Sequence, residues 1–166
     1  PYLLIHTGCE ALSPPGSVEH AYDDPAYGLR AHADSILFFT PCLAIVGRAN
    51  DPGKQSLAGD LFHAAMPVVT TFSSPRAWAY ALLGIDEYLR AFQGDSTIEG
   101  RRVELSERLL EMFNRTSRED WPWFEDSVTY CNARLSQSLI VSGAARNRKD
   151  MIEVGLRSLE WLSSVQ

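Results

Sequence analysis

The sequence contains few cysteines and lacks the residue spacings that suit a disulfide framework or a metal site. Its three cysteines, Cys9, Cys42 and Cys131, are widely separated and form no C-x-x-C pair, so neither a disulfide framework nor a zinc knuckle is indicated. The four histidines show no H-x-x-x-H spacing, and glycine-rich phosphate loops are absent. We therefore expect no metal and no nucleotide cofactor. The low cysteine usage favours a reducing compartment, the cytoplasm.

Basic charge and long apolar runs are scarce as well. The chain carries 15 Lys and Arg against 21 Asp and Glu, a formal net charge of -6, whereas a nucleic-acid-binding surface needs a basic face. Thr40-Pro41 interrupts the longest apolar stretch, which falls short of the roughly 18 residues that a membrane helix needs. Both observations predict a protein with no nucleic-acid partner and no membrane span.

What the sequence does contain is helical periodicity after residue 50. Residues 1–42 are rich in proline and predict an irregular or divergent segment, with one helical piece over 29–39. Further along, apolar residues recur at helical spacing and predict helices near 57–68, 75–92, 98–114, 130–141 and 150–162. The connections between them are short, so neighbouring helices should pack antiparallel as αα-hairpins. The predicted fold class is all-α.

Particular residues mark the ends of these helices. Ser74-Pro75 supplies an N-cap followed by proline at the first helical position, and Gly94 is the expected C-terminal cap of the same helix. Pro67 should end or kink the first helix. Ser142-Gly143 should end the fourth helix, because glycine there has the character of helix punctuation.

Between the third and fourth predicted helices, an aromatic and acidic loop combines residue types that a core rarely holds together. Trp121, Trp123 and Phe124 stand beside the carboxylates of Asp120, Glu125 and Asp126. Sugars have apolar ring faces and polar rims, so glycan sites pair aromatic platforms with carboxylates. Cleavage of a glycosidic bond needs a carboxylic acid and a second carboxylate, and an aromatic neighbour that excludes water favours the protonated acid.

A structural explanation of the same loop is open at this point. Asp126 would cap a helix, Glu125 would face solvent, and the tryptophans would fill a gap between hairpins.

Several stretches of the sequence together resemble a known group of bacterial proteins. They are residues 72–79 (Phe-Ser-Ser-Pro-Arg-Ala-Trp-Ala) with 83–85, residues 120–126 (Asp-Trp-Pro-Trp-Phe-Glu-Asp) with 130–135 (Tyr-Cys-Asn-Ala-Arg-Leu), and residues 155–162. Over residues 43–166 the chain is similar to a helical domain of the six-hairpin glycosidase-like superfamily. In that group the domain is often fused to, or found together with, family 1 or family 4 type glycosyltransferases.

The resemblance implies an (α/α) toroid, in which six helical hairpins surround a central glycan-binding cavity. Position 131 of the pattern is usually acidic, so Cys131 would impair this copy if that carboxylate is needed; the thiol itself we expect to be buried and inert. Twelve helices need about 300 residues, and the five predicted here are about half a ring. Residues 43–166 would thus be an excerpt whose remaining hairpins come from a longer chain or another subunit. By itself, the half-ring should self-associate through its uncovered faces.

These observations predict a carbohydrate-active domain that processes or binds an oligosaccharide or polysaccharide. Glu125 is the candidate general acid, with Asp126 and Asp120 as alternatives for the base or for hydrogen bonding to the substrate. The expected sugar platform consists of Trp121, Trp123 and Tyr130, and the residues expected to orient hydroxyl groups are Arg76, Asn132 and Arg134. The alternative function is a non-catalytic helical scaffold that supports a glycosyltransferase. Full burial of both Trp121 and Trp123, together with pairing of Glu125 on the outer surface, would favour this alternative.

Overall fold

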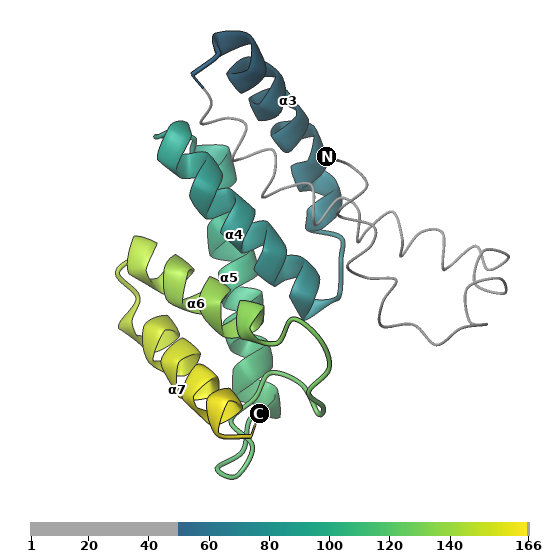
Figure 1. Ribbon diagram of the computed structural model, residues 1–166, viewed down its shortest axis with the longest axis vertical. Helices are drawn as coiled ribbons and strands as arrows, with labels where there is room; N and C mark the ends of the chain where they lie inside the picture. The colour runs from purple at the N-terminus through teal and green to yellow at the C-terminus, as the bar shows by residue number, and fades with distance from the viewer. Residues whose placement is uncertain (1–49, 166) are drawn as a thin grey trace, which may run out of the picture. The chain divides into compact units, whose positions relative to one another are not determined.

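A computed structural model of the chain describes residues 50–165, and this part consists of helices joined by loops (Figure 1). The helices are α3 (Pro52–Val69), α4 (Pro75–Ala91), α5 (Ser96–Thr116), α6 (Ala133–Ala145) and α7 (Lys149–Val165). No strand occurs between residues 50 and 165, which confirms the predicted all-α class for this part. No helix within this range is long and apolar enough to cross a membrane. The irregular segment predicted for 1–42, the helical piece within it and the boundary at residue 43 lie outside the described residues.

Helix α3 starts and ends differently from the prediction. The helix begins at Pro52, before the predicted start near residue 57, because Asp51 Oδ1 accepts hydrogen bonds from the N–H groups of Gly53 (3.0 Å) and Lys54 (3.2 Å). Pro67 does not end the helix, which continues to Val69. A proline this close to the C-terminal end removes only one hydrogen bond of the last turn, so the helix tolerates it.

Helix α4 begins at the predicted residue, and α5 begins two residues before its predicted start. Pro75 is the first residue of α4, and Ser74 occupies the N-cap position with extended backbone, but its side chain makes no capping hydrogen bond. The chain leaves α4 after Ala91, and Gly94 follows with a φ of 86°, in the left-handed region that glycine adopts at low cost. Asp95 then caps α5 through hydrogen bonds from the N–H groups of Thr97 and Ile98, both 3.1 Å.

Helix α6 corrects the expected positions of both its ends. It begins at Ala133 rather than Tyr130, and it runs through Gly143 to Ala145. The stop is made by Asn147, whose φ of 55° is left-handed. The N–H of Arg148 donates to the carbonyl of Gly143 (2.8 Å) and that of Asn147 to Ala144 (3.4 Å), the bond pattern of a Schellman C-cap. Asn147 therefore takes the left-handed C-cap position that was expected for a glycine.

Helix α4 lies between its neighbours and contacts α3, α5 and α6, while α6 and α7 share the most extensive helix interface. Figure 1 shows α4, α6 and α7 side by side, with α5 behind them. The small residues Ala77, Ala81 and Gly84 are buried on α4, where they allow a neighbouring helix to approach closely. Gly155 plays the same role in α7, because a Cβ there would lie 2.5 Å from Ile140 Cγ1.

Candidate functional site

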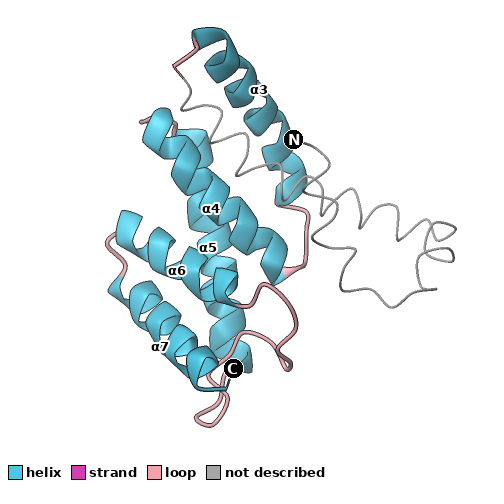
Figure 2. Cartoon of the chain, in the orientation of Figure 1, coloured by secondary structure: helices cyan, strands magenta, loops and turns pink. Residues whose placement is uncertain are grey.

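The aromatic and acidic loop spans residues 117–132 and connects α5 to α6 (Figure 2). It starts with a tight turn, in which Arg118 and Trp121 exchange backbone hydrogen bonds of 3.0 and 3.2 Å. The N–H of Trp123 then donates to the carbonyl of Trp121 (2.8 Å). Pro122 between them is buried. This local geometry turns the two residues after Pro122 inward.

Trp123 and Phe124 lie in the core, with no exposed surface. Phe124 meets Phe113 of α5 edge to face, with 5.2 Å between ring centroids. Trp161 of α7 lies 4.7 Å from Trp121 and 5.6 Å from Trp123, again between ring centroids. Aromatic rings at these separations contribute packing energy beyond their buried area. The cluster therefore fastens the loop to α5 and α7.

This placement gives Trp123 a different role from the sugar platform that the sequence suggested. A ring without exposed surface offers no face to a ligand in this conformation. Its Nε1 has no hydrogen-bond partner among the described residues. Trp121 is half-buried, and its Nε1 donates to the carbonyl of Glu125 (2.8 Å). The indoles thus hold the loop closed.

Arg76, in the first turn of α4, is the centre of the polar part of the site. Its guanidinium is almost completely buried, with 6% of the residue exposed. Nη1 donates to both carboxylate oxygens of Glu125, at 2.7 and 2.6 Å. Nε donates to the carbonyl of Tyr130 (2.7 Å) and Nη2 to Oδ1 of Asn132 (3.1 Å). The side chains expected to orient sugar hydroxyls, Arg76 and Asn132, bind to the protein itself.

Glu125 is paired in a way that does not suit a general acid. Both of its oxygens accept hydrogen bonds from a single guanidinium nitrogen, and a quarter of its side chain is exposed. A general acid must carry a proton and direct it at a leaving oxygen within hydrogen-bond reach. A carboxylate engaged by arginine on both oxygens is instead held in place as a structural ion pair. Asp126 caps no helix either, since α6 begins at Ala133.

The other predicted site residues lie on the surface. Asp120, Asp126 and Arg134 are exposed, and Tyr130 is 54% exposed. Arg134 Nη1 donates to Oε1 of Gln137 (2.7 Å), one turn along α6. The Tyr130 ring lies over the Arg76 guanidinium, at 4.9 Å from its centroid. The structure thus divides the predicted set into an inward cluster and an exposed rim.

Cys131 is exposed, which corrects the expectation of a buried thiol. Its φ of 49° is left-handed, an uncommon conformation for a residue with a side chain. Tyr80 of α4 lies beside it. Burial of the Tyr80 hydroxyl, followed by its hydrogen bond with Cys131, raises the pKa of Tyr80 to about 12.

Two polar clusters were missed because they join residues far apart in the sequence. In the first, His63 Nε2 lies 2.8 Å from Asp95 Oδ2, and the hydroxyl of Tyr88 donates to the same oxygen (3.0 Å). Burial, followed by the hydrogen bond to Asp95, raises the pKa of Tyr88 to about 12. This cluster joins α3 and α4 to the start of α5, so its role is to hold helices together.

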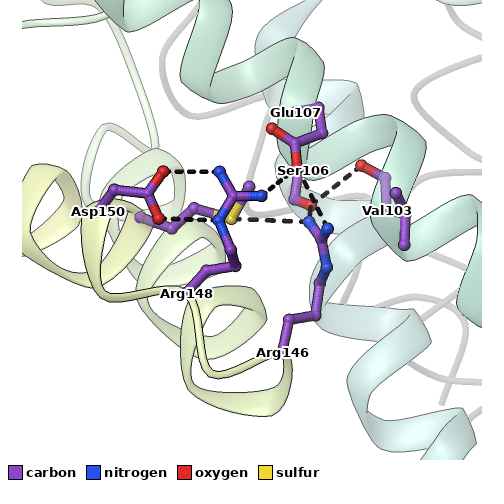
Figure 3. Close-up of polar contacts among 7 residues, drawn as sticks. Val103, Ser106, Glu107, Arg146, Arg148 and Asp150 are labelled. Atoms are coloured by element: carbon purple, nitrogen blue, oxygen red, sulfur yellow. Dashed lines mark hydrogen bonds and ion pairs between the residues drawn. The ribbon is translucent and has the colours of Figure 1, made fainter.

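The second missed cluster fastens the α6–α7 turn to α5 (Figure 3). Arg146 and Arg148 both bind Glu107 of α5, and Arg148 also binds Asp150. The hydrogen bonds to Asp150 and Glu107 raise the pKa of Arg148. Each arginine is neutralised by a carboxylate, so the cluster has no surplus charge for a ligand. No group of His, Cys, Asp and Glu within residues 50–165 could hold a metal ion.

Comparison of the chain with protein-family models, curated proteins and solved structures gives no significant match.

Proposed function

We propose that the chain is a non-catalytic αα-hairpin scaffold, in which the aromatic and acidic loop closes one end of the helices. The observation that carries this proposal is the pairing of Glu125 with buried Arg76, together with the complete burial of Trp123. These residues would be the acid and the platform of a glycosidase-like site, and both are used to hold the loop in place. Such a use fits a structural closure better than catalysis.

The proposed setting of this scaffold is carbohydrate metabolism, next to a glycosyltransferase. The sequence segments that carry the resemblance to six-hairpin glycosidase-like domains lie about 50 residues apart. Arg76 of the first segment binds Glu125, Tyr130 and Asn132 of the second. The two segments therefore meet at one place in the fold, which supports treating them as one unit. We propose that the described helices belong to an (α/α) toroid whose other hairpins lie elsewhere.

A second candidate function is glycan binding or processing at the exposed rim of the loop. Its support is the exposed aromatic ring of Tyr130, with the exposed side chains of Asp126 and Arg134 close to it in the sequence. An aromatic ring with charged groups at its edge has the chemistry that a sugar needs. In this candidate, Asp126 or Asp120 takes the role first given to Glu125.

The experiment that separates the two candidates uses Glu125→Gln and Asp126→Asn in the full chain. If the loop is a structural closure, Glu125→Gln lowers the free energy of unfolding by about 1–3 kcal/mol, because Arg76 loses its charged partner. Asp126→Asn, at an exposed position, should change it by about 0.5 kcal/mol or less. Urea titrations measure both changes.

Calorimetry with short manno- and gluco-oligosaccharides completes the test. The scaffold proposal predicts no heat of binding for the wild type or for either variant. Heat that is lost in Asp126→Asn or Tyr130→Ala, while the stability of the variant is unchanged, would favour the rim as a glycan site and overturn the scaffold proposal.

A further inference from the structure

Residues 125–131 are attached to the protein differently from the residues on either side. Trp123 and Phe124 before them have no exposed surface, and Asn132 after them is 6% exposed. The residues between are mostly exposed: Asp126, Ser127, Thr129, Tyr130 and Cys131. They form neither helix nor strand. A short segment with irregular backbone therefore lies between two firmly buried points, which is the arrangement of a hinged loop.

One side chain holds both ends of this segment. Arg76 Nη1 binds Glu125 at its start, and Arg76 Nε binds the carbonyl of Tyr130 near its end. Nη2 binds Asn132 at the second buried point. A guanidinium presents its donors in a fixed planar fork, so it can bind these acceptors at once where lysine could not. Loss of the fork would weaken the attachment of both ends of the segment together.

The segment has other attachments besides Arg76. Trp121 Nε1 donates to the carbonyl of Glu125 at its start (2.8 Å), Cys131 shares a hydrogen bond with Tyr80 of α4, and Val128 packs partly against the core. The N–H of Thr129 donates to Asn132 Oδ1 (3.1 Å), so this bond depends on the amide that Arg76 also holds. The φ of 49° at Cys131 adds backbone strain to the closed arrangement. Opening would relieve this strain, since the residue could return to an ordinary conformation.

We propose that residues 125–131 form a flap that opens and closes on the helices, and that the Arg76 guanidinium holds the flap in its closed position. When the flap opens, Trp123 and Phe124 stay in the core, and the guanidinium of Arg76 and the amide of Asn132 become accessible. The first lies in the opening turn of α4, and the second is the N-cap of α6. The flap is a device of the fold, and it does not depend on whether the domain is a scaffold or a glycan site.

Limited proteolysis of the full chain tests the flap. Chymotrypsin cleaves after aromatic residues, and cleavage after Tyr130 requires that several residues around it leave the surface. Where opening is fast compared with cleavage, the cleavage rate follows the population of the open form. Arg76→Lys keeps the positive charge but removes the fork. We expect cleavage after Tyr130 to become about tenfold faster or more, with cleavage after Trp123 unchanged.

Arg108→Lys is the matched control. Arg108 also donates to a backbone carbonyl, that of Thr70 (2.7 Å), and to a carboxylate, that of Glu104 (2.7 Å). It belongs to α5 and contacts no flap residue in these bonds, so cleavage after Tyr130 should stay at the wild-type rate. If Arg76→Lys does not fold, Glu125→Gln carries the test, with a smaller increase at the same site.

Two results would overturn the proposal. Equal cleavage rates after Tyr130 in the wild type and in the folded variant would mean that Arg76 does not control an opening. A parallel increase after Trp123 and other core aromatic residues would mean that Arg76 holds the whole fold together, and that the segment does not open on its own.

Discussion

At the residue scale, the Asp95 side chain makes several structural contacts at once. Its Oδ1 caps α5, while its Oδ2 binds the hydroxyl of Tyr88 and lies 2.8 Å from His63 Nε2. Burial alone would raise the pKa of this carboxyl. The hydrogen bonds from Ile98 N–H, Tyr88 and His63 outweigh burial and hold the pKa below its ordinary value. The charged form of Asp95 is therefore the form that stabilises the junction of α3, α4 and α5.

The lowered pKa of Asp95 determines how this residue makes the stability of the protein depend on pH. A carboxyl whose pKa is lower in the folded state adds stability above its unfolded pKa, near 4. The added stability disappears as the pH falls through the folded value. We expect Asp95→Asn to lower the free energy of unfolding at pH 7 by about 1–2 kcal/mol, and the difference from the wild type to vanish in strong acid. Urea titrations between pH 7 and pH 2 measure it.

Asn is as good an N-cap as Asp, so this variant removes the charge and keeps the cap. Asp126→Asn, at an exposed position of the loop, controls for the loss of one negative charge. If the free energy of unfolding of Asp95→Asn stays below that of the wild type by the same amount down to the lowest pH, the charged carboxylate is not the stabilising form.

Glycine positions of α7 and α5 offer a second test at the residue scale. A Cβ at Gly155 would lie 2.5 Å from Ile140 Cγ1 and 3.0 Å from the carbonyl oxygen of Ser136. Gly155→Ala should therefore destabilise the protein by about 1–3 kcal/mol, as overpacking does. At Gly100 of α5 a Cβ meets nothing within 4 Å, so Gly100→Ala should stabilise it by about 0.5–1 kcal/mol. Thermal unfolding shows directly whether the two variants change the stability in opposite directions. Equal changes in both variants would contradict the close approach of α6 and α7 at Gly155.

At the element scale, all five described helices were predictable, whereas helix ends that depend on distant contacts were not. Pro75 begins α4 because its missing N–H and fixed φ suit the first helical position, a property of the residue itself. Gly143 was expected to stop α6, yet it lies inside the helix. A Cβ there would come within 2.9 Å of the Arg148 carbonyl and of Met151 Cβ. Gly143 therefore allows α6 to pack closely on α7, and no local sequence pattern reveals this contact.

The true stop of α6 gives a prediction at the same scale. Asn147 holds a φ of 55°, where glycine has no steric cost. We expect Asn147→Gly to raise the free energy of unfolding by up to about 1 kcal/mol. Asn114→Gly is the control, because Asn114 is exposed in the last turn of α5 and has no positive φ. That change should lower stability by a similar amount. Chemical denaturation that shows a loss for both variants would contradict the C-cap at Asn147.

At the scale of the whole molecule, the composition of 120–126 marks this loop as unusual but does not show which way its side chains face. Whether Trp123 faces a cavity or the core depends on Trp161, and the state of Glu125 depends on Arg76. Both partners lie about 40 to 50 residues away in the sequence and on other helices. Aromatic and acidic residue types are equally suited to a sugar site and to a buried structural contact, so composition alone could not separate the two roles.

Exposed apolar side chains on α3 and α7, the first and last helices of the described residues, lead to the last prediction. Leu57, Leu61 and Val68 of α3 are 60%, 42% and 42% exposed, and they recur at the spacing of one helix face. Leu156 of α7 is 54% exposed. Large exposed aliphatic side chains in a row favour association, so we expect the full chain to self-associate in light scattering. Gln at both Leu57 and Leu61 should shift it toward the monomer, whereas Val103→Gln, on α5, should not. A wild-type monomer that binds no hydrophobic dye would show that these faces are not adhesive, and the half-ring expectation would then lose its physical basis.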